Sequence, residues 1–175
     1  FQYYDKHFVK RSMGKWYFQD KPLNIFGAID FAFSTKQRAD FTCLVIIGMD
    51  ADGNIFVLDI DRFKTNRISD YFECISRAHV KWDVRRIAAE ISVAQVAIVE
   101  DLKAKIREYG LALSIKSVSP TRHGGTKEER VRACLQPRYE NGTMWHYRGG
   151  AIDDLEMELI QTRPTHDDIK DALTM

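Results

Sequence analysis

The stretch NIFGAIDFAF, from Asn24 to Phe33, decides the fold class of this chain. It is almost continuously apolar and carries one charge, Asp30, which is typical of a central strand buried on both faces. Two similar runs follow, FTCLVIIGM from Phe41 to Met49 and IFVLDI from Ile55 to Ile60. Between them residues 50–54, DADGN, have turn composition, so the second and third strands are expected to form a hairpin.

Beyond residue 60 the sequence pattern alternates between helical and strand periods. Apolar residues recur every three or four positions in some segments, while others are short, apolar runs. The pattern predicts helices over residues 68–82, 99–109, 127–135 and 152–159 and from 165 onward, and strands over residues 85–92, 111–118 and 143–147. The expected fold is therefore α/β, with a mixed central sheet, antiparallel in its first three strands and then parallel, covered by helices on both faces.

Composition narrows the class of protein. The 175 residues are 45% hydrophobic and 29% charged, which excludes disordered and fibrous chains. Net charge is +1, so any contact with nucleic acid has to come from local patches. No apolar run approaches the roughly 20 residues that span a bilayer, so no membrane partner is expected. The three cysteines form no CxxC pair, which argues against a zinc ribbon or a disulfide framework.

Two acids stand inside apolar strands. Burying Asp30 costs several kcal/mol unless the carboxylate is paired or binds a metal. The alternatives are an ion pair with a buried arginine, or a strand end that already meets water. Glu90 repeats the pattern in the short run AAEI, although an exposed edge position would also explain it. Two strands that each carry one interior acid favour a shared site.

A third group of acids opens the last predicted helix, THDDIKDAL from Thr165 to Leu173. Acids in a first helical turn also cap the helix, which is the simpler interpretation. The functional interpretation places Asp30, Glu90 and the pair Asp167 and Asp168 around one pocket. Oxygen ligands of this kind suit Mg²⁺ or Mn²⁺ rather than zinc. Two such ions, about 4 Å apart, can support phosphodiester hydrolysis.

Five motifs in this order resemble the nuclease domain of tailed-phage terminase large subunits. They are GAIDFA, AAEI, PTRHGGTKEERV at 120–131, YENG at 139–142 and HDDIKDAL. Those subunits are DNA-packaging motors with an RNase H-like nuclease fold, and the resemblance covers residues from about 24 to 175. It implies a metal-dependent endonuclease that cleaves double-stranded viral DNA during genome packaging in the host cell cytoplasm.

The resemblance also assigns roles to residues. Asp30 matches the first catalytic acid, Glu90 the second, where many terminases place Asp, and Asp167 the third. The predicted metal ligands are these three and Asp168. His166 and Asp171 are expected in the second shell, although Asp171 lies four residues after Asp167 and so could itself face the pocket.

A local basic cluster is the expected DNA-binding surface. It lies in the loop and helix near residue 127 and contains Arg122, His123, Lys127, Arg130 and Arg132. The alternative is a solvated helix whose charge is offset by Glu128 and Glu129. No motif for reading base edges is visible, so sequence-tolerant binding is expected.

The resemblance implies partners: double-stranded DNA, the portal protein, the small terminase subunit and the ATPase domain of the full-length protein. The chain has no GxxxxGK[ST] motif, so it is not expected to contain that ATPase domain. Residues 1–20 are therefore expected to be a linker from the ATPase domain, and residues 21–175 the nuclease domain. Two alternatives stay open. One is another RNase H-fold nuclease of the resolvase, RNase H or transposase type, and the other is a non-catalytic DNA-docking module of the packaging motor.

Overall fold

The structure is a computed structural model, and it describes residues 1–32, 41–92, 95–118, 126–161 and 164–175. Its centre is a mixed β-sheet that contains nine strands in these ranges. Strands β4 (Lys21–Asp30), β5 (Thr42–Met49) and β6 (Ile55–Phe63) pair antiparallel, as the three apolar runs predicted.

The later strands add to this sheet in parallel. β7 (Arg86–Glu90) pairs with the second half of β4, and β8 (Ser114–Val118) pairs with β7. On the other side β9 (Met144–His146) pairs parallel with β6. An antiparallel start followed by parallel strands confirms the predicted fold class.

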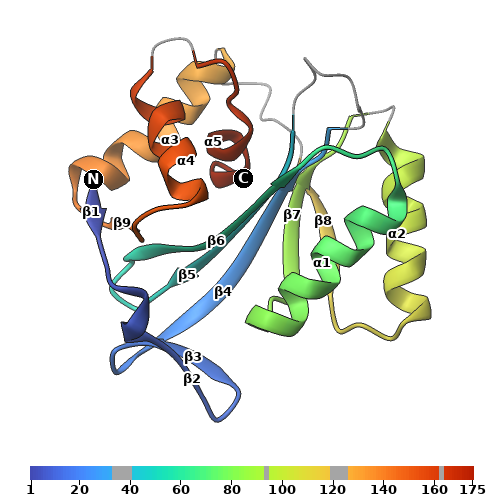
Figure 1. Cartoon of the computed structure of the whole chain (residues 1–175), viewed down its shortest axis with the longest axis horizontal. Coiled ribbons are helices and arrows are strands. Elements are labelled where there is room, and N and C mark those ends of the chain that lie inside the picture. The colour runs from blue at the N-terminus through green and yellow to red at the C-terminus, as the bar shows by residue number, and fades with distance from the viewer. Residues whose placement is uncertain (33–40, 93–94, 119–125, 162–163) are drawn as a thin grey trace.

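Residues 1–20 are part of the sheet. β1 (Gln2–Tyr3) pairs with β9, and β2 (Val9–Ser12) and β3 (Lys15–Phe18) form a hairpin that continues into β4, below the rest of the sheet in Figure 1. A short 3-10 turn, Lys6–Phe8, joins β1 to β2. Residues of this segment therefore pair as strands, and their role as a lead-in from an ATPase domain stays a prediction.

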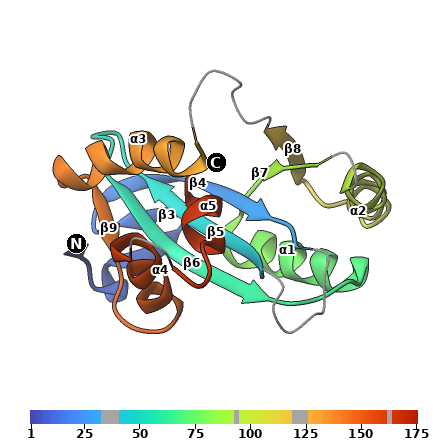
Figure 2. The ribbon, with the colours of Figure 1, turned by 90° about the horizontal axis from the view of Figure 1, so that it is seen from above.

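The helices lie on both faces of the sheet (Figure 1). One face carries α1 (Ile68–Trp82) and α2 (Val96–Glu108). The other carries α3 (Lys127–Glu140), α4 (Ala151–Ile160) and α5 (Asp168–Leu173). From above, α5 lies over β4 and β5 between α3 and α4 (Figure 2). Strand alternation divides the core accordingly, since Leu44 and Ile46 face α1 while Val45 faces α3 and α5.

Gly27 explains why β4 and β7 pair closely. A Cβ atom at this position would stand 3.0 Å from Cγ1 of Ile87 and 3.1 Å from Cδ1 of Ile46, so a larger residue would displace the neighbours. Ile29, Ile87 and Ala89 are fully buried around this contact. The two strands that end in Asp30 and Glu90 are thus fixed by the core.

Within the described ranges, no helix combines the length and the apolarity that crossing a membrane requires.

Candidate active site

Asp30 and Glu90 are neighbours at the ends of two parallel strands. They are the last residues of β4 and β7, and their Cα atoms are partners in the register of the pair. Registered residues of adjacent strands point to the same face, so both carboxylates lie on the side that α5 covers. The strand register therefore brings the two predicted acids side by side, and their shared catalytic role stays a prediction.

The third acid at this place is Asp171. A cavity of about 900 Å³ is lined by Asp30 from β4, Glu90 from β7, Asp171 from α5, and Lys127 and Arg130 from α3. Three carboxylates from three separate elements therefore border one cavity.

The other two acids of the HDD segment lie differently. Asp167 is the N-cap of α5, its side chain is 38% exposed, and one of its oxygens lies 3.0 Å from the Lys127 ammonium. Asp168 is buried, with a carboxylate oxygen 3.5 Å from the Arg62 guanidinium. Among the described residues that line the cavity, Asp171 is present and Asp167, which precedes the helix as its N-cap, is not.

His166 lies away from the cavity lining. Its half-buried ring packs edge-on against Phe41, with 5.0 Å between the ring centroids, and its Nδ1 is 4.0 Å from an Asp168 oxygen. It therefore contacts the residues under α5 and none of the three cavity acids.

The predicted basic cluster divides in the same way. Lys127 and Arg130 line the cavity, whereas Arg132 is exposed on α3 and does not line it. Arg122 and His123 lie outside the described residues. A capping box fixes the start of α3, since the Thr126 side chain accepts from the Glu129 N–H and the Glu129 carboxylate accepts from the Thr126 N–H.

Lys127 neutralises part of the acidic cavity. Its ammonium forms ion pairs with both Asp167 and Asp171. Burial lowers the pKa of this lysine, but the hydrogen bonds to the two carboxylates outweigh burial and raise its pKa above the ordinary value. The sequence marked Lys127 as a DNA contact and gave no signal that it would pair with the acids.

Burial raises the pKa of Asp30 to about 7, and neighbouring carboxylates add to the shift. The largest cause is burial, followed by the charge of Asp171, and the nearby Lys127 ammonium opposes the shift. Burial likewise raises the pKa of Asp171. Each of these groups would be stabilised as an anion by a further positive charge in the cavity.

The donor set fits a hard divalent cation. The cavity acids offer only oxygen ligands, and Oδ1 of Asp171 is buried without a hydrogen-bond partner among the described residues. In the same part of the chain, no three His, Cys, Asp or Glu side chains already converge as a metal site. The other oxygen of Asp171 is engaged by Lys127 instead.

A buried clamp holds α5 in place. Oε2 of Glu158, on α4, accepts hydrogen bonds from the backbone N–H groups of Ile169 (3.0 Å) and Lys170 (2.9 Å). Arg62 on β6 lies 3.8 Å from Glu158 and 3.5 Å from Asp168. Glu158 and Arg62 were not predicted from the sequence, although a glutamate between Met157 and Leu159 in an apolar helix was an available signal.

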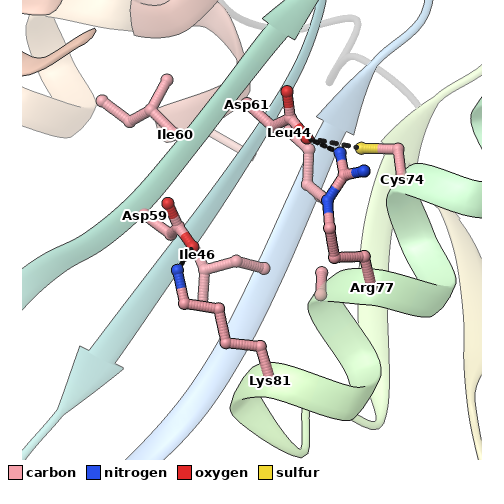
Figure 3. Close-up of a pocket in the computed structure, with 9 residues that line it drawn as sticks. Leu44, Ile46, Asp59, Ile60, Asp61, Cys74, Arg77 and Lys81 are labelled. Carbon is pink, nitrogen blue, oxygen red and sulfur yellow. Dashed lines mark hydrogen bonds and ion pairs between the residues drawn. The ribbon is translucent and has the colours of Figure 1, made fainter. Parts of the chain in front are cut away.

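Acids on the opposite face of the sheet are fully paired. Under α1 a cavity of about 160 Å³ contains Asp59 and Asp61 (Figure 3). Asp59 lies 2.6 Å from the Lys81 ammonium, and Asp61 forms an ion pair with Arg77. Each carboxylate has a cation from α1, so this second group of acids joins the helix to the sheet.

Comparison with protein-family models identifies the chain. Residues 27–175 match the model described as the terminase RNaseH-like domain. The chain belongs to this terminase family. The match spans all of the carboxylates described above, and it confirms the resemblance on which the site was predicted. A comparison with curated protein sequences gave no match.

Solved structures share the fold of this terminase domain. The large terminase nuclease of the thermophilic phage G20c, determined with bound magnesium, has a TM-score of 0.59 at 17% identity, over 95% of this chain and 87% of that one. The same nuclease with bound zinc has a TM-score of 0.58 at 20% identity, over 95% and 88%. The yeast mitochondrial Holliday junction resolvase Ydc2 has a TM-score of 0.54 at 12% identity, over 85% and 75%. At such identities the likeness establishes the RNase H-like nuclease fold.

Proposed function

We propose that this terminase domain is a divalent-metal-dependent endonuclease that cleaves double-stranded viral DNA during genome packaging. The observation that carries the proposal is the convergence of Asp30, Glu90 and Asp171 on one cavity beside two cations. Membership of the terminase family supplies the substrate and the process. The magnesium in the G20c terminase nuclease supports Mg²⁺, and the oxygen donors suit Mn²⁺ equally.

The proposed ligands of one or two metal ions are carboxylates from separate elements. Asp30 and Glu90 would hold the metal from the strand ends, and Asp171 would complete the set from α5, with Asp167 as the alternative third ligand. When bound, two such ions neutralise the charge that develops on the attacking and leaving oxygens of phosphodiester hydrolysis. Lys127 and Arg130 hold the DNA phosphates next to the acids.

The same proposal covers the partners of the domain and the place where it acts. The portal protein, the small terminase subunit and the ATPase domain of the full-length protein are its proposed partners, and the host cell cytoplasm is its site of action. Arg122, His123 and Arg132 are proposed as further phosphate contacts. These assignments rest on the family to which the chain belongs.

Plasmid cleavage tests the proposal. Supercoiled plasmid is incubated with the chain in Mn²⁺, in Mg²⁺ and in EDTA, and nicked and linear products are expected only with metal. Asp30→Asn should abolish them. Asp61→Asn is the matched control, since it removes a carboxylate from the opposite face of the sheet. Cleavage in EDTA, or full activity of folded Asp30→Asn, would reject the proposal.

A second substrate separates this function from that of a resolvase. The structural likeness to Ydc2 is the observation that favours a four-way junction as substrate. A terminase-type nuclease should cut linear duplex and junction DNA at comparable rates, whereas a resolvase should cut the junction far faster. Binding of both DNAs without any cleavage would identify a non-catalytic docking module.

A further inference from the structure

A second groove opens next to the carboxylate cavity. It has a volume of about 420 Å³ and lies between α3, the end of α5 and the sheet. Ala28 and Ala88, on β4 and β7, form part of its floor, while their buried neighbours Ile87 and Ala89 face the opposite side. Val118, Cys134 and Met175 line both the groove and the carboxylate cavity, so the two spaces adjoin.

The sheet places an exposed ring and two cations together at the far end of this groove. Gly27 is registered with Ile87, which sets Phe26 beside Arg86, and Ala88 is registered with Lys116. Phe26 is 39% exposed, and Arg86 and Lys116 are exposed as well. In Figure 2, β7 and β8 lie beyond the ends of α3 and α5.

The charged side chains in the described lining of the groove are all basic. Arg86, Lys116 and Arg138 line it, and the described lining contains no Asp or Glu side chain. In the described part of the chain, none of these three cations forms an ion pair. The cations of α1, by contrast, are paired with Asp59 and Asp61. An apolar floor edged by unpaired cations fits a ligand with flat apolar groups and repeated negative charge.

We propose that this groove binds an unpaired strand of nucleic acid, with bases on the apolar floor and Phe26, and phosphates on Arg86, Lys116 and Arg138. Single strands expose both bases and phosphates, and aromatic platforms with basic edges are the usual way to hold them. A duplex hides its bases and would leave Phe26 unused. An acidic amphipathic peptide is the other ligand of similar chemistry, but the adjoining carboxylate cavity favours nucleic acid.

This proposal rests on the proposed function, because the place of cleavage sets the direction in which the bound strand runs. A strand held in the groove runs toward Asp30 and Glu90, so the domain engages DNA that is unpaired beside the phosphate to be cut. The groove itself requires no metal, and its occupancy can be measured separately from cleavage.

Binding of a labelled thymidine oligonucleotide in EDTA, followed by fluorescence anisotropy, tests the groove. Phe26→Ala should weaken binding about tenfold, in the range of one lost base stack, and Phe26→Tyr should retain it. Arg86→Ala and Lys116→Ala should each reduce the slope of log affinity against log salt by about 0.7. Tyr109→Ala and Arg107→Ala, exposed residues of the α2 end, are the matched controls and should bind like the parent chain.

Two results would overturn the inference. One is unchanged oligonucleotide affinity in Phe26→Ala together with unchanged salt slopes in the two basic variants. The other is an acidic amphipathic peptide that displaces the oligonucleotide and itself loses affinity in the same variants, which would assign the groove to a protein. Because binding is read in EDTA, it is measured without cleavage. Absence of metal-dependent plasmid cleavage by the parent chain, with oligonucleotide binding retained, would therefore refute the proposed function and not the groove.

Discussion

Replacing Asp30 with asparagine should stabilise the metal-free domain while it abolishes cleavage. The folded chain raises the pKa of Asp30 to about 7 from an ordinary value of 3.8. At 1.36 kcal/mol per pKa unit, keeping this carboxylate ionised in the fold costs on the order of 4 kcal/mol, an upper value because water reaches part of the group. Asparagine keeps the shape of the side chain without that cost.

The sign of the pH dependence follows from the raised pKa. A carboxyl group with a raised folded-state pKa contributes stability below its unfolded pKa, and this stability is lost as pH rises through the folded value. The unfolding free energy of the parent chain in EDTA should therefore fall between about pH 4 and pH 7. Asp30→Asn lacks this contribution. Glu158, whose pKa burial also raises to about 7, is present in both proteins and cancels in the difference.

Urea unfolding in EDTA across this pH range measures the effect. At pH 8 Asp30→Asn should be the more stable protein, and the difference should vanish near pH 4. Added Mn²⁺ should stabilise the parent chain more than the variant, because the variant has lost an anionic ligand. A variant less stable than the parent at pH 8 in EDTA, or equally stabilised by Mn²⁺, would refute the account of Asp30 as a crowded metal-binding carboxylate.

Four further substitutions test the geometry around the cavity. Asp171→Asn should abolish plasmid cleavage and Mn²⁺ binding while Asp167→Asn reduces them, and the reverse order would restore Asp167 as the third ligand. Lys127→Ala should lower the melting temperature in EDTA, since two carboxylates lose their cation. It should also reduce the slope of log duplex affinity against log salt by about 0.9. An unchanged slope would exclude a phosphate contact. Glu158→Ala should cost about 2–4 kcal/mol of unfolding free energy in urea, because two buried N–H groups lose their acceptor, and a cost near zero would mean that α5 docks without the clamp.

The strand acids were predictable because their signal is local. A single charge within an apolar, strand-length run identifies Asp30 from its neighbours alone, and Glu90 follows from the same pattern. The alternation of a strand then determines which face each acid occupies. The pairing of both at the ends of parallel strands follows from the α/β order.

The choice between Asp167 and Asp171 was not local. α5 begins at Asp168, and the first helical N–H groups find their acceptor in Glu158, which belongs to another helix. Nothing within HDDIKDAL specifies that contact, so the sequence left the rotation of the helix open. Tertiary structure decided which acid reaches the cavity.

The first strands escaped prediction for a related reason. β1 has two residues and pairs with β9, more than 140 positions later in the chain. Its stability comes from that partner and from contacts such as the Tyr4 hydroxyl, which donates to the Val57 carbonyl at 2.6 Å. A segment this short has no periodicity of its own, so its sequence did not predict a strand.

Asp171 lies far from Asp30 and Glu90 in the sequence, so the ribosome synthesises it much later than the other two acids. Asp30 and Glu90 emerge early and lie on strands that the core fixes, whereas Asp171 follows on a six-residue helix more than 80 positions after Glu90. Because domains are synthesised from the N-terminus, a nascent chain that has reached α3 holds two acids and the lysine but not the third carboxylate. Under the proposed function, a nascent domain is therefore expected to gain cleavage activity only once α5 has docked.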